Sequence, residues 1–228
     1  MLTHSVLARS GIKRPEDLRG KKIGITRFGS NTHYFATQVF RRSGLDPGRD
    51  VTFIQTGGEP EAFAALAGGV VDAATLSPPM DARALAQGFH PVISGPDLKI
   101  PYLAAVFVTR RSTIARRPEV VARFMRVMAE AARILHTDRD FALRVVGKQL
   151  KLDDRKILET AYAAEIRALE RRLEIRREGL EAVLDEVAQT EPKARGVRPE
   201  DLVDRRYLED MEKSGFFDKL WAHSGRPS

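Results

Sequence analysis

The chain contains no cysteine and only one tryptophan, and no apolar run approaches the ~18 residues that a membrane-spanning helix needs. The absence of cysteine excludes disulfides, thiolate metal sites and a cysteine nucleophile. None of the five histidines has the helical spacing of a metal-binding pair, and no Gly-x-Ser-x-Gly motif is present. We therefore expect no metal, no cofactor and no catalysed reaction. Residues 1–7 lack the pattern of a secretory signal peptide.

The charge of the chain is balanced along its length although its sum is positive. The 228 residues include 38 Lys and Arg against 31 Asp and Glu, giving a net charge of +7. The two signs are interleaved, as in residues 167–174, which is typical of a solvated helix face rather than of a nucleic-acid surface. We expect no nucleic-acid partner. A hydrophobic fraction of 43% predicts a packed, folded chain.

The first hundred residues alternate between short β-rich runs and helical patterns, which predicts an α/β fold with a mostly parallel sheet covered on both faces. Strands are expected at residues 5–8, 22–26, 51–55, 72–76, 91–93 and 103–109, with helices at 31–43 and 60–67. After residue 109 the pattern becomes helical. Amphipathic helices are expected at residues 118–135, 138–150, 153–168 and 178–188.

Small polar loops follow three of the predicted strands, and they are the best candidates for a binding site. The first lies in GITRFGSNTHYF, residues 24–35, where a strand turns through glycine into a helix. A P-loop would place lysine after Gly29, and the missing lysine excludes a nucleotide site. A helix N-terminus nevertheless offers N–H donors to an anionic or polar ligand. The candidate ligand-binding residues are Gly29, Ser30, Asn31, Thr32, Gly57, Gly58, Ser77 and Pro78.

These loops share an expected edge, because ligands collect at the carboxyl ends of parallel strands. We expect Ser30, Gly58 and Ser77 to lie on one rim of one sheet. Taken singly, Ser30 is equally well explained as a helix N-cap, and the glycines and prolines as ordinary turn residues. Trp221 and Phe216–Phe217 are expected to anchor the C-terminal segment in a core.

Several stretches resemble a known family, namely ABC-transporter substrate-binding proteins of the nitrate, sulfonate, taurine and thiamine-pyrimidine type. They are IKRPEDLRGKKIGITRFGS, GLDPGRDVTFIQTGGEPEAFAALAGGVVDAATLSPP, RPEVVARFMRVMAEA and LDEVAQTEPKARGVRPEDLVDRRYLEDMEKSGFFDKLW. The resemblance implies a bilobal, type II-like periplasmic-binding-protein fold with ligand in a cleft. One intact α/β lobe would comprise residues 18–102, and residues 1–17 and 103–228 would form a partial, mostly helical first lobe.

The resemblance also implies a function and a departure from the family. The function is to capture a small polar or anionic molecule in the periplasm or at the cell surface and to deliver it to a membrane permease. The alternatives on the same fold are a thiamine-pyrimidine-type biosynthetic enzyme and a ligand-sensing domain. The chain lacks the N-terminal part of the first lobe, whether as a fragment, through a late start or by true truncation. We therefore expect uncovered apolar surface, self-association, and an unpaired strand edge near residues 4–9 or 103–109.

Overall fold

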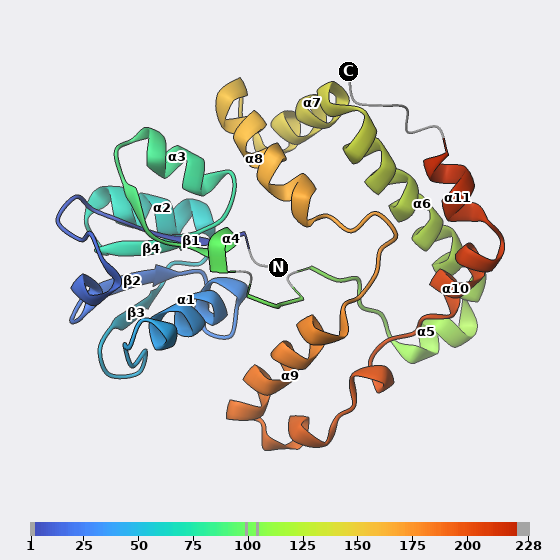
Figure 1. Cartoon of the computed structure of the whole chain (residues 1–228), viewed down its shortest axis with the longest axis horizontal. Helices are drawn as coiled ribbons and strands as arrows, with labels where there is room; N and C mark the ends of the chain where they lie inside the picture. Colours follow the sequence, from blue (N-terminus) through green and yellow to red (C-terminus); the bar gives the residue numbers. More distant parts are fainter. Residues whose placement is uncertain (1–2, 99, 104, 223–228) are drawn as a thin grey trace. The chain divides into compact units, whose positions relative to one another are not determined.

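The structure is a computed structural model that describes residues 3–98, 100–103 and 105–222 (Figure 1). The chain divides into two compact units. Unit 1 comprises Met1–Ala104 and Asp154–Glu165, and unit 2 comprises Ala105–Asp153 and Ile166–Ser228. This division differs from the predicted one, which grouped residues 1–17 with 103–228. Residues 1–17 belong to unit 1 because a strand within them is hydrogen-bonded into its sheet.

The sheet of unit 1 has five strands in the order β3-β2-β4-β1-β5. These are β1 (Ser5–Ala8), β2 (Lys22–Ile25), β3 (Thr52–Gln55), β4 (Ala73–Leu76) and β5 (His90–Ser94). β2 is parallel to β3 and to β4, whereas β1 is antiparallel to both of its neighbours, β4 and β5. Four strands therefore share one direction, which confirms the α/β fold class. β1 has a partner on each side, so the unpaired edge predicted near residues 4–9 is wrong.

Four helices connect these strands, namely the 3-10 helix η1 (Pro15–Leu18), α1 (Asn31–Arg42), α2 (Glu59–Gly68) and α3 (Met80–Ala86). The helix α4 (Gly95–Leu98) and most of α8 (Arg155–Ala168) follow β5 in the chain and also belong to unit 1. α1 begins after Ser30, whose side-chain oxygen accepts the backbone N–H of His33. α2 ends at Gly69, which adopts a left-handed backbone with φ of +80°.

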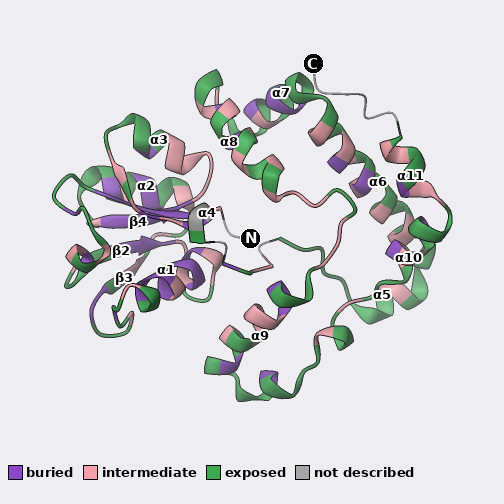
Figure 2. Ribbon diagram, in the orientation of Figure 1, coloured by how far each residue is buried: buried purple, intermediate pink, exposed green. Residues whose placement is uncertain are grey.

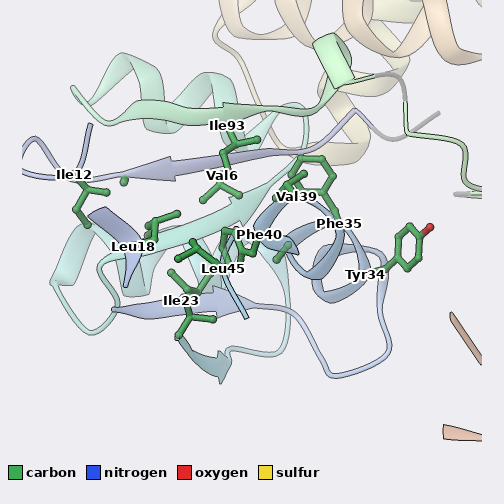
Figure 3. Packing of buried hydrophobic residues seen from close by; sticks show 14 of the residues in the cluster. Val6, Ile12, Leu18, Ile23, Tyr34, Phe35, Val39, Phe40, Leu45 and Ile93 are labelled. Carbon is green, nitrogen blue, oxygen red and sulfur yellow. The ribbon is translucent and has the colours of Figure 1, made fainter. Parts of the chain in front are cut away.

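Alternate residues along each central strand enter two different cores, one on each face of the sheet. Val6 and Ala8 of β1 join the core that contains Phe35 and Phe40 of α1 (Figure 3). Leu7 joins the second core, which contains residues of α2 and α3. Burying one large apolar side chain stabilises a fold by about 1.5–3 kcal/mol, so this two-sided burial carries much of the stability of unit 1.

Unit 2 is helical. Its elements are α5 (Arg111–Arg116), α6 (Pro118–Thr137), α7 (Arg139–Leu150), α9 (Arg177–Thr190), η2 (Pro192–Gly196), η3 (Pro199–Asp201), α10 (Arg206–Lys213) and α11 (Phe216–Trp221). The core of unit 2 joins α6 to α10 and α11 through Ala129, Met211 and Phe217. Phe216 and Trp221 pack against the same cluster, which confirms the predicted C-terminal anchor.

The predicted strand at residues 103–109 is wrong. Residues 105–110 form no strand, and Val106, Phe107 and Val108 are exposed, Val108 by 87%. Their β-branched and aromatic composition satisfied a strand pattern without a partner strand to pair with. Residue 104 lies outside the described residues. Among the described helices, none combines the length and apolar character needed to cross a membrane.

Candidate functional site

The carboxyl ends of β2, β3 and β4 meet at one edge of the sheet of unit 1, because these strands run in the same direction. Hydrogen bonds connect the loops that leave them. Gly57 donates its N–H to the carbonyl of Thr26 at 3.0 Å, and Phe28 donates to Oε1 of Gln55 at 2.9 Å. The predicted common rim for Ser30, Gly58 and Ser77 therefore exists, and we call it the strand-end edge.

In the loop after β2, three hydroxyl groups bond mainly to one another. Ser30 donates its proton to the carbonyl of Arg27 at 2.7 Å and accepts from Thr26 Oγ1 at 2.8 Å. Thr32 is buried, and its Oγ1 accepts the N–H of Thr26 at 2.9 Å. The Ser30 proton is thus used within the loop. The structure supports the N-cap reading of Ser30, and any ligand contact by Ser30 must use its oxygen as an acceptor.

The remaining predicted residues set the backbone of the loops. Gly29 and Gly57 have φ of +75° and +102°, a region that favours glycine. Gly58 is the N-cap of α2, Asn31 is the first residue of α1, and the bond from Pro78 to Pro79 is cis. These positions shape the strand-end edge, and their contact with a ligand stays a prediction.

The loop after β4 already holds an anion, which is a carboxylate of the chain itself. Ser77 donates its backbone N–H to Glu59 Oε2 at 2.7 Å and its hydroxyl to Oε1 at 2.8 Å. Glu59 is the first residue of α2, where the helix dipole also favours a negative group. Burial raises the pKa of Glu59, Ser77 partly offsets this, and the Glu165 charge raises it further. The donors of Ser77 are therefore engaged.

Two more carboxyl groups and a histidine lie near Glu59. Burial raises the pKa of Asp81, in the first turn of α3, to about 6, and the charges of Glu59 and Glu165 add to the rise. His4 Nε2 lies 3.8 Å from Glu59 Oε1. Burial lowers the pKa of His4 to about 4, so the imidazole is neutral at pH 7 and forms no ion pair with Glu59. We call His4, Glu59, Asp81 and Glu165 the edge cluster.

Sequence reasoning missed the edge cluster, although part of the signal was present. Glu59 directly follows Gly58, and Asp81 lies shortly after Ser77 and Pro78, so both come directly after loops that the sequence analysis had identified as candidates. His4 precedes its strand and reaches this edge only because β1 runs antiparallel, a direction that its sequence does not reveal. Within the described part of the chain, no three His, Asp or Glu side chains are arranged to hold a metal ion.

An aromatic group lies beside the loop after β2. His33 makes edge-to-face contacts with Phe28 and Phe53, with ring centroids 5.2 Å and 5.0 Å apart. Phe28 remains 56% exposed, which is unusual for a large apolar side chain, and offers an apolar wall at the strand-end edge. None of these three residues was among the candidate ligand-binding residues predicted from the sequence.

A surface hollow in unit 2 is a weaker candidate. It has a volume of about 350 Å³ and is lined by Arg111, Ile114, Ala115, Pro118, Asp204 and Arg206. Of its three charged residues, Asp204 and Arg206 pair with each other at 2.6 Å, and Arg111 donates to the carbonyl of Asp201. All three are thus engaged within the chain, so the strand-end edge is the better site.

Comparison with solved structures identifies the fold. The chain is similar to the periplasmic aliphatic sulphonate binding protein SsuA from Escherichia coli, with a TM-score of 0.69 and 17% identity over 90% of this chain and 70% of that one. It is similar to the ligand-binding component of an ABC-type import system from Staphylococcus aureus, with a TM-score of 0.70 and 14% identity over 91% and 70%.

An enzyme shares the same fold. The desulfurization enzyme DSZB matches with a TM-score of 0.66 and 15% identity, over 93% of this chain and 76% of that one. No curated protein matches the sequence. The family model described as NMT1/THI5 like matches residues 2–141, which is more than half of the 228 residues. The chain is therefore a member of the NMT1/THI5-like family with the fold of periplasmic binding proteins.

Proposed function

We propose that this protein is the solute-binding component of an ABC importer, which captures a small polar molecule and delivers it to a membrane permease. The observation that carries the proposal is the strand-end edge, where three loops of one parallel sheet region lie beside the partly buried carboxyl groups of Glu59 and Asp81 and the neutral His4. This is the place where open α/β sheets bind ligands. The similar binding proteins of E. coli and S. aureus support the same role.

The same comparisons support a periplasmic or cell-surface location, because the E. coli relative is a periplasmic protein. They also support a membrane permease as partner, because the S. aureus relative belongs to an import system. The residues that we propose to line the site are Gly29, Ser30, Asn31, Thr32, Gly57, Gly58, Ser77 and Pro78, together with the edge cluster.

The match to DSZB means that this fold also supports catalysis. The contacts at the strand-end edge favour binding over catalysis. The Ser-His pair of a hydrolytic serine is not formed here among the described residues, because the Ser77 hydroxyl donates to Glu59 and His4 makes no hydrogen bond to Ser77. The Ser77 hydroxyl thus holds Glu59 in place. We infer a binding protein rather than an enzyme.

Mass spectrometry of the small molecules released by denaturing the purified chain tests this proposal. We expect one polar compound in near-stoichiometric amount, and the variant Glu59→Gln should release less of it. Glu61→Gln is the matched control, because Glu61 lies in the same first turn of α2 and is exposed. Turnover of the released compound by the chain would instead show an enzyme.

A further inference from the structure

The edge cluster concentrates negative charge without an internal counter-ion. Glu59, Asp81 and Glu165 come from α2, α3 and α8, and Glu59 and Glu165 each act on the pKa of Asp81. Glu165 Oε1 accepts a hydrogen bond from the Thr3 hydroxyl at 2.9 Å. Among the residues that the structure describes, no lysine or arginine forms an ion pair with any of the three carboxyl groups. Charges placed in this way raise one another's pKa values and favour the approach of a cation.

His4 gives an independent indication that a partner is missing. Its side chain is only 8% exposed, and its Nδ1 is buried without a hydrogen-bond partner among the described residues. Its Nε2 faces Glu59 Oε1 at 3.8 Å, which is too long for a hydrogen bond. Buried polar atoms are rarely left unsatisfied in folded proteins, and an exception calls for an explanation. A ligand N–H group placed between Nε2 and Glu59 Oε1 would donate to these two atoms, whereas Nδ1 lies on the other side of the ring and would stay without a partner.

The donors at this end of the strand-end edge are already taken by the chain. The Ser77 N–H and hydroxyl bind Glu59, and the Ser30 hydroxyl donates to the carbonyl of Arg27. An anionic group placed here would displace Glu59 and face Asp81 and Glu165. A group that carries N–H donors and positive charge would find acceptors already oriented by Ser77 and Thr3.

We infer that the edge cluster binds a protonated nitrogen group of the transported solute, either a primary ammonium or an amidinium. This inference rests on the proposed solute-binding function and names the chemical class of the ligand. It reverses, for this part of the site, the preference for an anionic ligand that the helix N-termini predicted. The recognised group is organic rather than a metal ion, since the described His, Asp and Glu residues form no metal-binding group.

Isothermal titration calorimetry of the full 228-residue chain with two matched pairs of probes tests the inference. Taurine and isethionate differ only by an ammonium in place of a hydroxyl group, and benzamidine and benzamide differ by an amidinium in place of an amide. We expect the ammonium or amidinium member of at least one pair to bind at least tenfold more tightly than its hydroxyl or amide counterpart. Asp81→Asn and Glu165→Gln should each abolish this preference, and Glu61→Gln should preserve it.

Each outcome decides the matter. Equal or tighter binding of the hydroxyl or amide member in both pairs overturns the inference while leaving a solute-binding function in place. A preference for cations that survives both Asp81→Asn and Glu165→Gln also overturns it. Absence of binding by all four probes overturns it too. The proposed function is then tested separately by mass spectrometry of the small molecules that denaturation releases. Circular dichroism of each variant shows whether it is folded. Because Glu165 and Asp81 lie on different helices, one variant can still test the inference if the other does not fold.

Discussion

The two units of the chain bury their apolar residues to different degrees, as Figure 2 shows. In unit 1 the strands β1, β2 and β4 and helix α1 are largely buried, with Phe35 and Phe40 of α1 fully so. In unit 2 the 20-residue helix α6 buries only Ala129 and Ala132, while Phe124 remains 43% exposed. A sheet with helices on both faces encloses its own core, whereas an amphipathic helix needs a second surface to cover it.

The difference extends to charge. Several acidic residues of unit 2 pair with arginine, as Asp201 does with Arg198 at 2.8 Å, and this holds the pKa of Asp201 below its usual range. In the edge cluster of unit 1, the pKa values of Glu59 and Asp81 are raised, mainly by burial and further by neighbouring carboxylate charge. Perturbed carboxyl groups are typical of functional sites, so this contrast in charge supports the proposal that unit 1 carries the binding site.

The largest expected effect compares one phenylalanine from each unit. Phe40→Ala leaves a cavity in a closed core and should lower the free energy of unfolding by about 3–5 kcal/mol. Phe124→Ala removes a half-exposed ring, whose one aromatic neighbour is Phe107, and should cost less than about 1 kcal/mol. Urea unfolding followed by circular dichroism measures both. Equal losses would show that α6 is as well packed as α1.

The second prediction concerns the exposed face of α6. Val120, Phe124, Val127 and Ile134 lie at helical spacing on one face and are all exposed. An apolar stripe of this kind favours association, and we expect the purified chain to self-associate. Phe124→Gln combined with Val127→Gln should raise the dissociation constant at least tenfold, which is about 1.4 kcal/mol.

Size-exclusion chromatography with light scattering measures this association. Leu85→Gln in unit 1 is the matched control, because Leu85 is 47% exposed but lies on the short helix α3. We expect that control to associate like the parent chain. A parent chain that is monomeric at all concentrations tested would contradict the prediction.

The smallest effect concerns the pH dependence of stability. Because the pKa of Asp81 is raised to about 6, the folded chain binds more protons than the unfolded chain between about pH 4 and 6. The contribution of Asp81 to stability therefore falls as the pH rises through this window. Asp81→Asn removes this titrating group. The free energy of unfolding of the variant should exceed that of the parent chain by on the order of 1 kcal/mol at pH 7, after allowance for solvent screening, and by little near pH 4.

Chemical denaturation at a series of pH values measures that difference. The groups that act with Asp81 are His4, Glu59 and Glu165, and they are unchanged in the variant, so their own pH dependence largely cancels in the comparison. Asp201→Asn in unit 2 should behave in the opposite way, because its lowered pKa stabilises the fold above the ordinary pKa range. A difference for Asp81→Asn that does not grow with pH would contradict the assignment.

Helical periodicity predicted the helices of unit 2 closely. The expected helices at residues 118–135 and 138–150 correspond to α6 and α7, Pro118–Thr137 and Arg139–Leu150. The patterns were strong because Pro118 starts one helix and Asp138 caps the next by accepting the N–H of Phe141. Local signals of this kind depend only on neighbouring residues, and so the sequence alone was sufficient.

Pairing between distant residues limited the prediction elsewhere. Val106 and Val108 have strand-like side chains, yet no partner strand is present and residues 105–110 form no strand. At the site, the positions of the strand ends correctly predicted that the three loops lie at one edge of the sheet. They did not predict that the N–H and hydroxyl of Ser77 would donate to Glu59. That choice depends on a contact across 18 positions of sequence, which periodicity and spacing do not encode.

Amide ¹H–¹⁵N NMR spectra of the chain would show which residues a small solute contacts, and we expect them to be those of the strand-end edge of unit 1. The spectra would be recorded during titration with whichever of taurine, isethionate, benzamidine or benzamide binds most tightly. We predict that the largest chemical-shift changes occur at Glu59 and Asp81 of the edge cluster and at the neighbouring Gly58 and Ser77. Saturable changes confined to residues of unit 2, such as Arg111 and Ile114 beside its surface hollow, would contradict binding at the strand-end edge.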